Sequence, residues 1–243
     1  MSEQHPSTTG TIKLYATAPH RCSYIPGNAA TTLFVDPFYP MDTGVYSYLS
    51  RLGFRRSGNH IYRPECPGCD ACIPARIPVR RFEPDRSQRR TWEHNRDLEV
   101  RCLPGIQPDR HYALYERYIT LRHQDGDMFP PDRDQFENFL GCEWSETYSY
   151  EFNLGDRPVA VAIVDRLNDG LSAIYTFFDP DEERRSLGTL AVLWQVQEAR
   201  RMGLPWVYLG YWIPSCRKMS YKGRYQPLEI LRDGSWTPAE KRL

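Results

Sequence analysis

The pattern of hydrophobic and polar positions is most regular after residue 105, where it predicts a succession of helices and strands. Apolar residues recur at helical spacing in some stretches and alternate with polar residues in others. The expected elements, in chain order, are helices over 112–122 and 136–140, strands over 148–152, 159–167 and 171–178, a helix after Gly188 and a strand over 206–211. Short turns join the three consecutive strands, so we expect them to pair antiparallel. The fold class is therefore α/β, of the mixed α+β kind.

The first hundred residues differ, because they are dense in proline, glycine, arginine and cysteine. Asp42 is placed to cap a helix that ends at Gly53, and residues 54–62 predict a hairpin. We expect three regions: a disordered segment over 1–12, an N-terminal Cys-rich and Arg-rich α+β region over 13–104, and a C-terminal domain over 105–243.

The predicted order of elements matches the GCN5-related N-acyltransferase (GNAT) fold, in which the loop after the third strand holds an activated acyl donor. Here that loop is Glu182–Gly188. Backbone N–H groups at the start of a helix carry partial positive charge and bind phosphate or carbonyl oxygens. The loop lacks the second glycine that close approach to a coenzyme A pyrophosphate favours, and a solvated helix cap is the alternative. The residues expected to bind the donor are Arg184, Arg185, Ser186 and Gly188.

Charge and composition narrow the classes of partner. The formal net charge is zero, so no global attraction to nucleic acid is expected, but residues 200–224 contain six basic and no acidic residues. Such a local field favours an anionic partner. No run of 18 apolar residues exists, so neither a membrane span nor a membrane partner is expected. The chain starts without the features of a secretory signal, and its seven cysteines then indicate a reducing, cytoplasmic location.

Three cysteines, Cys66, Cys69 and Cys72, lie within seven residues. Two thiolates three residues apart can turn toward one metal ion, and Cys22 could supply a fourth ligand. A tetrahedral Zn²⁺ or an iron–sulfur cluster would fit such a set. The alternative is a group of reduced thiols that pack a Pro/Gly turn.

A run of basic residues follows the cysteines and could track an RNA backbone, with Trp92 or Phe82 available for stacking on bases. Five acidic residues between Glu83 and Glu99 dilute this charge, so a solvated helix face is the alternative. The basic residues are Arg76, Arg80, Arg81, Arg86, Arg89 and Arg90.

Ordered motifs run through nearly the whole chain: CSYIPG at 22–27, GFRRSG at 53–58, YRP at 62–64, CPGCDACIP at 66–74, RH at 122–123, YTFFDPD at 175–181, SLG at 186–188, YLGY at 208–211 and CRKMSYK at 216–222. Together they resemble the aminoacyl-tRNA–protein transferases of the N-degron pathway, specifically the bacterial aspartate/glutamate leucyltransferase branch. The eukaryotic arginyl relatives begin with a Cys-x-x-Cys pair. Ile25 stands in place of its second cysteine here, so their metal site is not carried over intact.

The resemblance implies an N-end rule aminoacyltransferase that needs no cofactor for its reaction. Leucine would pass from Leu-tRNA to the α-amino group of proteins that begin with Asp or Glu, which marks them for degradation. Three alternatives remain at this stage: an arginyl-tRNA donor, a coenzyme A-dependent N-acetyltransferase, and a metal-centred module that binds RNA or protein.

The ester of an aminoacyl-tRNA is already activated, so the enzyme must chiefly orient amine and carbonyl, accept a proton and stabilise an oxyanion. Asp179, at the end of the third predicted strand, is the candidate base, and Tyr175 is the candidate oxyanion donor. The alternative for Asp179 is a loop cap. The residues expected to bind the acidic acceptor are Arg217, Lys218, Lys222, Tyr208, Tyr211 and, less directly, Arg76.

Overall fold

The computed structural model describes residues 11–240, so most of the segment expected to be disordered, 1–12, lies outside the described residues. The helices are α1 (Thr43–Arg51), α2 (Arg86–His94), α3 (Pro108–Arg122), α4 (Arg133–Leu140), α5 (Leu187–Arg201) and the short 3₁₀ helices η1 (Pro180–Arg185) and η2 (Ser220–Arg224). The strands are β1 (Leu14–Ala16), β2 (His20–Arg21), β3 (Ala29–Ala30), β4 (Thr32–Val35), β5 (Arg55–Ser57), β6 (His60–Pro64), β7 (Ile73–Pro78), β8 (Glu99–Pro104), β9 (Glu146–Leu154), β10 (Arg157–Arg166), β11 (Gly170–Phe178), β12 (Trp206–Trp212), β13 (Glu229–Arg232) and β14 (Ser235–Pro238).

An eight-stranded sheet forms the body of the molecule, in the order β14-β13-β7-β12-β11-β10-β9-β8. β8 to β11 pair antiparallel, while β11 and β12 are parallel and are connected through α5. The predicted order of helix, helix, three antiparallel strands, helix and strand is confirmed by α3, α4, β9 to β11, α5 and β12. The structure is therefore a mixed α/β fold.

β7 comes from the region expected to be a separate N-terminal unit, yet it lies between β12 and β13 in the large sheet. The division expected at residue 104 therefore does not separate two sheets. Hydrophobic alternation reports which residues of a strand are buried, but it does not report which distant strand pairs with it.

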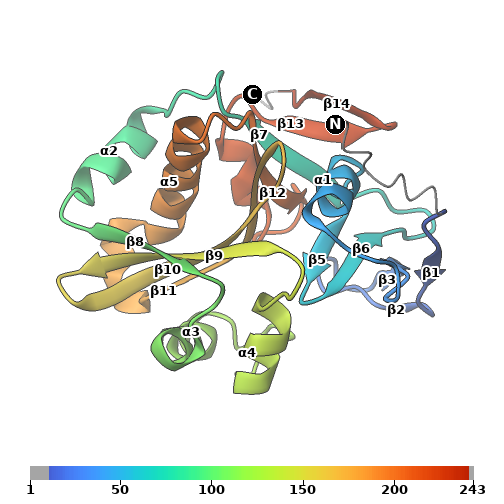
Figure 1. Cartoon of the computed structure of the whole chain (residues 1–243), viewed down its shortest axis with the longest axis horizontal. Coiled ribbons are helices and arrows are strands. Elements are labelled where there is room, and N and C mark those ends of the chain that lie inside the picture. Colours follow the sequence, from blue (N-terminus) through green and yellow to red (C-terminus); the bar gives the residue numbers. More distant parts are fainter. Residues whose placement is uncertain (1–10, 241–243) are drawn as a thin grey trace, which may run out of the picture.

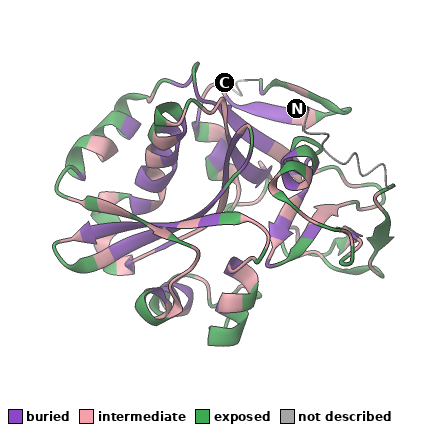
Figure 2. Cartoon of the chain, in the orientation of Figure 1, coloured by how far each residue is buried: buried purple, intermediate pink, exposed green. Residues whose placement is uncertain are grey.

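Helices cover both faces of the β8–β11 half of the sheet, as Figure 1 shows. α2 and α5 lie on one face, where Leu190 and Val196 pack against β10 and β11. α3 and α4 lie on the other, where an aromatic cluster includes Tyr115, Phe136 and Phe177. Burial is densest along the strands between these layers (Figure 2). Within residues 11–240, no helix is long and apolar enough to cross a membrane.

A four-stranded sheet of order β1-β4-β6-β5 and helix α1 form the N-terminal part. Asp42 caps α1 by accepting the Val45 N–H at 2.7 Å, and Ser57 pairs with His60 across the hairpin turn. Both features are as predicted.

A buried ion pair joins β5 to β10. Arg56 donates to both carboxylate oxygens of Asp165, at 2.5 and 2.8 Å, and neither side chain is exposed to solvent. Arg56 also donates to the Leu140 carbonyl and the Thr147 hydroxyl, and Tyr46 donates to Asp165. These hydrogen bonds hold the backbone of β5 in place at Arg56 and therefore also at the adjacent Arg55.

Candidate active site

The two central parallel strands separate soon after they begin. β11 and β12 are paired only where Gly170–Ser172 faces Trp206–Tyr208. Both strands continue well beyond that point, to Phe178 and Trp212. Backbone groups that lose their strand partner must find another one when they are buried. A side chain from the N-terminal part meets this need.

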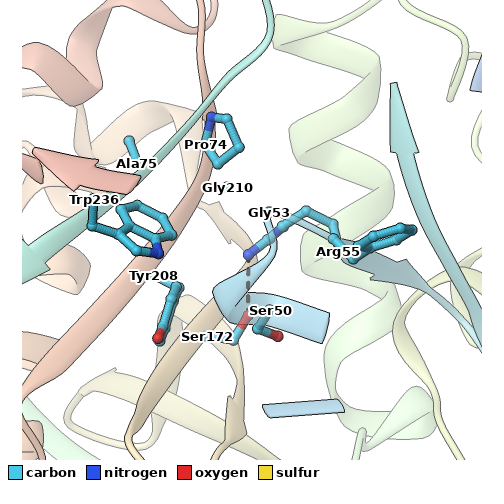
Figure 3. A pocket seen from close by; sticks show the side chains of 10 residues that line it. Ser50, Gly53, Arg55, Pro74, Ala75, Ser172, Tyr208, Gly210 and Trp236 are labelled. Atoms are coloured by element: carbon cyan, nitrogen blue, oxygen red, sulfur yellow. Dashed lines mark hydrogen bonds between the residues drawn. The ribbon is translucent and has the colours of Figure 1, made fainter. Parts of the chain in front are cut away.

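Arg55 of β5 occupies the opening between the two strands. Its guanidinium donates to Ser172 Oγ at 3.1 Å and to the Ala173 carbonyl at 2.5 Å, both on β11. On the opposite side it lies against Gly210 of β12, where a Cβ atom would stand 2.9 Å from Arg55 Nε. Gly210 also has φ of +74°, so glycine is needed there for two reasons. Figure 3 shows Arg55 reaching Ser172 from its strand; both residues line a small hollow together with Tyr208.

Lys222 of η2 is a second cation in this region. Its side chain is buried, and Nζ donates to the Tyr211 carbonyl at 2.6 Å. Burial and, second to it, the positive charge of Arg55 lower the pKa of Lys222 to about 7. Among the residues that the structure describes, neither Lys222 nor Arg55 forms an ion pair with a carboxylate.

Tyrosines surround the two cations. Burial raises the pKa of Tyr24, Tyr62 and Tyr211, and the charge of Arg55 acts against this shift in each case. The three phenols are therefore neutral near pH 7. Tyr211 donates its hydroxyl to the Gly53 carbonyl at 3.0 Å, and its ring lies 6.2 Å from that of Tyr62. The three tyrosines therefore lie near enough to Arg55 for its charge to act on each phenol, and an arginine fork suits a carboxylate ligand.

The two residues expected to act in catalysis lie further along β11. Tyr175 is half-buried and packs edge-on against the rings of Tyr118 and Phe139. Asp179 accepts from Arg157 at 2.5 Å and forms a second ion pair with Arg117 at 3.4 Å. Its other oxygen accepts the N–H of Asp181 and so caps η1. The carboxylate thus has the capping role given as the alternative, and its role as a base stays a prediction.

Arg76, expected as a further cation for the acceptor, is committed to internal contacts. Its guanidinium lies 3.5 Å from the ring centroid of Trp206 and 4.2 Å from that of Trp236. It also pairs with Glu229 at 2.9 Å, and this side chain is almost fully buried. Its charge is therefore already balanced, and Arg76 holds β7 against β13.

The remaining residues expected to bind the acceptor do not all line this hollow. Tyr208 lines it and donates its hydroxyl to Asp169 at 3.1 Å. Lys218 is exposed and pairs with Asp125 at 2.7 Å. Arg217 is exposed beside it. Of the expected cations, Lys222 is the one that shares the environment of Arg55.

The expected donor loop has a defined geometry. Arg185 pairs through both terminal nitrogens with Asp97 at 2.9 Å, so its fork is occupied, while Arg184 is exposed. Ser186 has φ of +53°, which turns the chain from η1 into α5. A Cβ at position 188 would lie 3.2 Å from an aromatic ring of β11, so Gly188 lets α5 pack closely on the sheet.

The structure brings the four candidate metal ligands around one small hollow: Cys22, Cys66, Cys69 and Cys72. Cys22 Sγ accepts the N–H groups of Tyr24 and Ile25 at 3.5 and 3.4 Å, which orients this thiol. Burial raises the pKa of Cys72 to about 12. No group of three or more His, Cys, Asp or Glu residues within 11–240 is arranged to hold a metal ion. Metal binding stays a prediction.

Sequence reasoning did not single out Arg55 as a site residue. The available signal was its place in the GFRRSG motif, directly before Arg56. That motif contains two adjacent arginines with different roles: Arg56 is buried in an ion pair, whereas Arg55 enters the gap between β11 and β12.

The chain is similar in sequence to known proteins over nearly its whole length. Residues 20–90 match the family described as "Arginine-tRNA-protein transferase, N terminus", and residues 110–232 match its C-terminal counterpart. Relatives named "Aspartate/glutamate leucyltransferase" from Pseudomonas fluorescens (strain Pf0-1) and Pseudomonas entomophila (strain L48) are each 55% identical over 225 residues, which cover 93% of this chain and 96% of the relative. Among solved structures, a C-terminal DUF2156 domain from Agrobacterium fabrum has a TM-score of 0.46 at 15% identity, over 76% of this chain and 62% of that one.

Proposed function

The chain belongs to the arginine-tRNA–protein transferase family, and we propose that it moves leucine from Leu-tRNA to the α-amino group of proteins that begin with Asp or Glu, marking them for N-degron degradation. The relatives' names support the leucyl donor and the acidic acceptors. The observation that carries the proposal is that two basic side chains, the half-buried Arg55 and the buried Lys222, have no carboxylate partner among the described residues.

The acceptor's first side chain is the partner that this pair lacks. Arg55 uses two of its five N–H donors on Ser172 and Ala173, so others remain for a carboxylate. Partial burial of Arg55 lowers the local screening, which strengthens its attraction to a carboxylate. A protein that begins with Ala offers these basic groups no carboxylate, which is the basis of selectivity.

The reaction joins the acceptor's nitrogen to the leucyl carbonyl carbon, breaks the ester bond to the tRNA ribose and moves the amine proton to the departing ribose oxygen. We assign the transfer of that proton to Asp179 and the stabilisation of the oxyanion to Tyr175. Replacement of Asp179 by Asn should slow single-turnover transfer by about 100-fold, in the range typical of a general base. An unchanged single-turnover rate would show that Asp179 serves only as a cap for η1.

The donor's 3′ end is assigned to the start of α5, with Arg184, Ser186 and Gly188 next to its phosphates, as in a GNAT-like acyltransferase. The order of β9 to β12 and α5 and the separation of β11 from β12 support this assignment. A tRNA ester presents a ribose and phosphates instead of a pantetheine arm, so one glycine in the loop is enough. We also propose that the protein acts in the cytoplasm without a membrane partner. The four cysteines are proposed to hold a structural metal ion.

One assay tests the function directly. Leucyl-tRNA and arginyl-tRNA, each labelled in the amino acid, are mixed with peptides that differ only in a first residue of Asp, Glu or Ala. We expect product from leucyl-tRNA with the Asp and Glu peptides and none with Ala. Product from arginyl-tRNA alone would show that the donor is arginyl-tRNA. Acetylation of the peptides by acetyl-coenzyme A would show that the protein is an acetyltransferase and contradict the proposal.

A further inference from the structure

α2 presents arginines on its outer face and buries its inner face. Arg86, Arg89 and Arg90 are exposed and follow the i, i+3, i+4 spacing of one helix face. Gln88 is buried, and Trp92 packs against the core, so the indole is not available for stacking on a base. Figure 1 shows α2 at the edge of the molecule, outside α5.

Of the acidic residues that flank α2 or lie in it, Asp85, Glu93 and Asp97 have partners, whereas Glu83 does not among the described residues. Asp85 caps the helix by accepting the Gln88 N–H at 2.8 Å. Glu93 pairs with Arg96, and Asp97 pairs with Arg185. Glu83 is exposed before the helix.

The three outer arginines have no carboxylate partner within residues 11–240. Arg89 donates to a backbone carbonyl, that of Pro84. Their positive charge is therefore exposed on a molecule whose formal net charge is zero.

The same helix is connected to both sides of the candidate active site. At its first turn, Gln88 donates to the Arg224 carbonyl at 3.1 Å, and Arg224 belongs to η2, which also contains Lys222. At its other end, Asn95 donates to the Arg185 carbonyl at 2.8 Å, beside the exposed Arg184 of the donor loop.

We propose that Arg86, Arg89 and Arg90, continued by Arg224 and Arg184, form a docking face for the phosphate backbone of the donor tRNA. The inference rests on the proposed function, because it assumes an RNA-borne donor. Arginine forks suit phosphate oxygens, and neutralisation of phosphates releases counterions, so binding must weaken with salt. The face then holds the RNA while its 3′ end reaches the donor loop.

The test measures binding of deacylated, fluorescently labelled tRNA to the full chain by anisotropy at several salt concentrations. In the variant Arg86→Gln/Arg89→Gln/Arg90→Gln, the loss of three phosphate contacts should reduce the salt slope by roughly 2 to 3. Between about 50 and 200 mM salt, wild-type affinity should therefore fall roughly 15- to 60-fold more than that of the variant. Glutamine has a helix propensity close to that of arginine, so α2 should persist, which a melting curve checks.

Two further variants separate charge from fold. Arg86→Lys/Arg89→Lys/Arg90→Lys keeps the charge and should retain most of the salt slope. The matched control replaces three exposed arginines that are already paired with acids, each by Gln, and should bind tRNA as the wild type does: Arg101, Arg133 and Arg166.

An unchanged affinity and slope in the Gln variant would overturn the proposal. A raised KM for the acceptor peptide with unchanged tRNA binding would assign the face to protein and would also overturn it. Failure of the function is distinguishable: the wild type would then form no leucylated peptide, while tRNA binding would still depend on these arginines.

Discussion

The buried Arg56–Asp165 pair should be the most sensitive point in the attachment of β5 to the large sheet. Replacement of Asp165 by Asn leaves the Arg56 charge buried without its counterion, since both side chains have zero exposure. Breaking such a pair by removing one partner costs about 3 to 5 kcal/mol. Arg56→Met should cost a similar amount, because it leaves the carboxylate buried with only the hydroxyls of Thr147 and Tyr46 as donors.

The assay is urea unfolding followed by circular dichroism and tryptophan fluorescence, with linear extrapolation to water. The double variant Arg56→Met/Asp165→Asn should lose less than the sum of the single losses, with a coupling energy of about 2 to 3 kcal/mol. Arg166→Met is the matched control, because Arg166 adjoins Asp165 in β10 but forms an exposed pair; its stability should equal that of the wild type. A small loss in Asp165→Asn, or simple additivity, would refute the reasoning.

Three other predictions concern the surroundings of Arg55. Because burial lowers the pKa of Lys222 to about 7 from an ordinary 10.5, the unfolded chain binds more protons than the native one between those pH values. Wild-type stability relative to Lys222→Met should therefore rise with pH across this window in urea titrations, and a constant difference would contradict the shift. Gly210→Ala introduces a Cβ at 2.9 Å from Arg55 and strains a φ of +74°. It should lower the free energy of unfolding by about 1 to 2 kcal/mol and reduce kcat/KM for Asp peptides. A melting temperature and kinetics equal to those of the wild type would contradict the contact. Burial raises the pKa of Cys72 to about 12, so little thiolate exists at neutral pH. Alkylation of Cys72 by iodoacetamide should therefore be slow at pH 7 and become faster as the pH rises, which mass spectrometry can follow. Rapid labelling at pH 7 would contradict the raised pKa.

Local elements were predictable from the sequence because their signals are local. Asp42 at the start of α1, the turn after Ser57 and the alternation in β9 each depend on residues a few positions apart. These signals specify an element but not always its buried face, since the polar positions of β9, Ser149, Glu151 and Asn153, are buried as well. They do not specify its partner across the sheet, and for this reason the central position of β7 was missed.

The candidate site was predictable only in part, for a related reason. Lys222 was found because it lies in a run of basic residues, and its burial follows from tertiary packing alone. Arg76 belongs to a basic run as well, but it is paired with Glu229 from a strand more than a hundred positions away. The Arg55 side chain lies in the opening between β11 and β12, and no residue pattern in either strand predicts that opening.

The preference for Asp over Asn at the first position of an acceptor peptide tests the central claim most directly. The ratio of kcat/KM values for the two peptides should be large in the wild type, and in Arg55→Gln the value for Asp should fall roughly 100-fold while that for Asn changes little. The ratio then collapses, because the cation that recognises the carboxylate is gone. An equal fall for both peptides, with the ratio preserved, would show that Arg55 only supports the fold and that the acidic acceptor is recognised elsewhere.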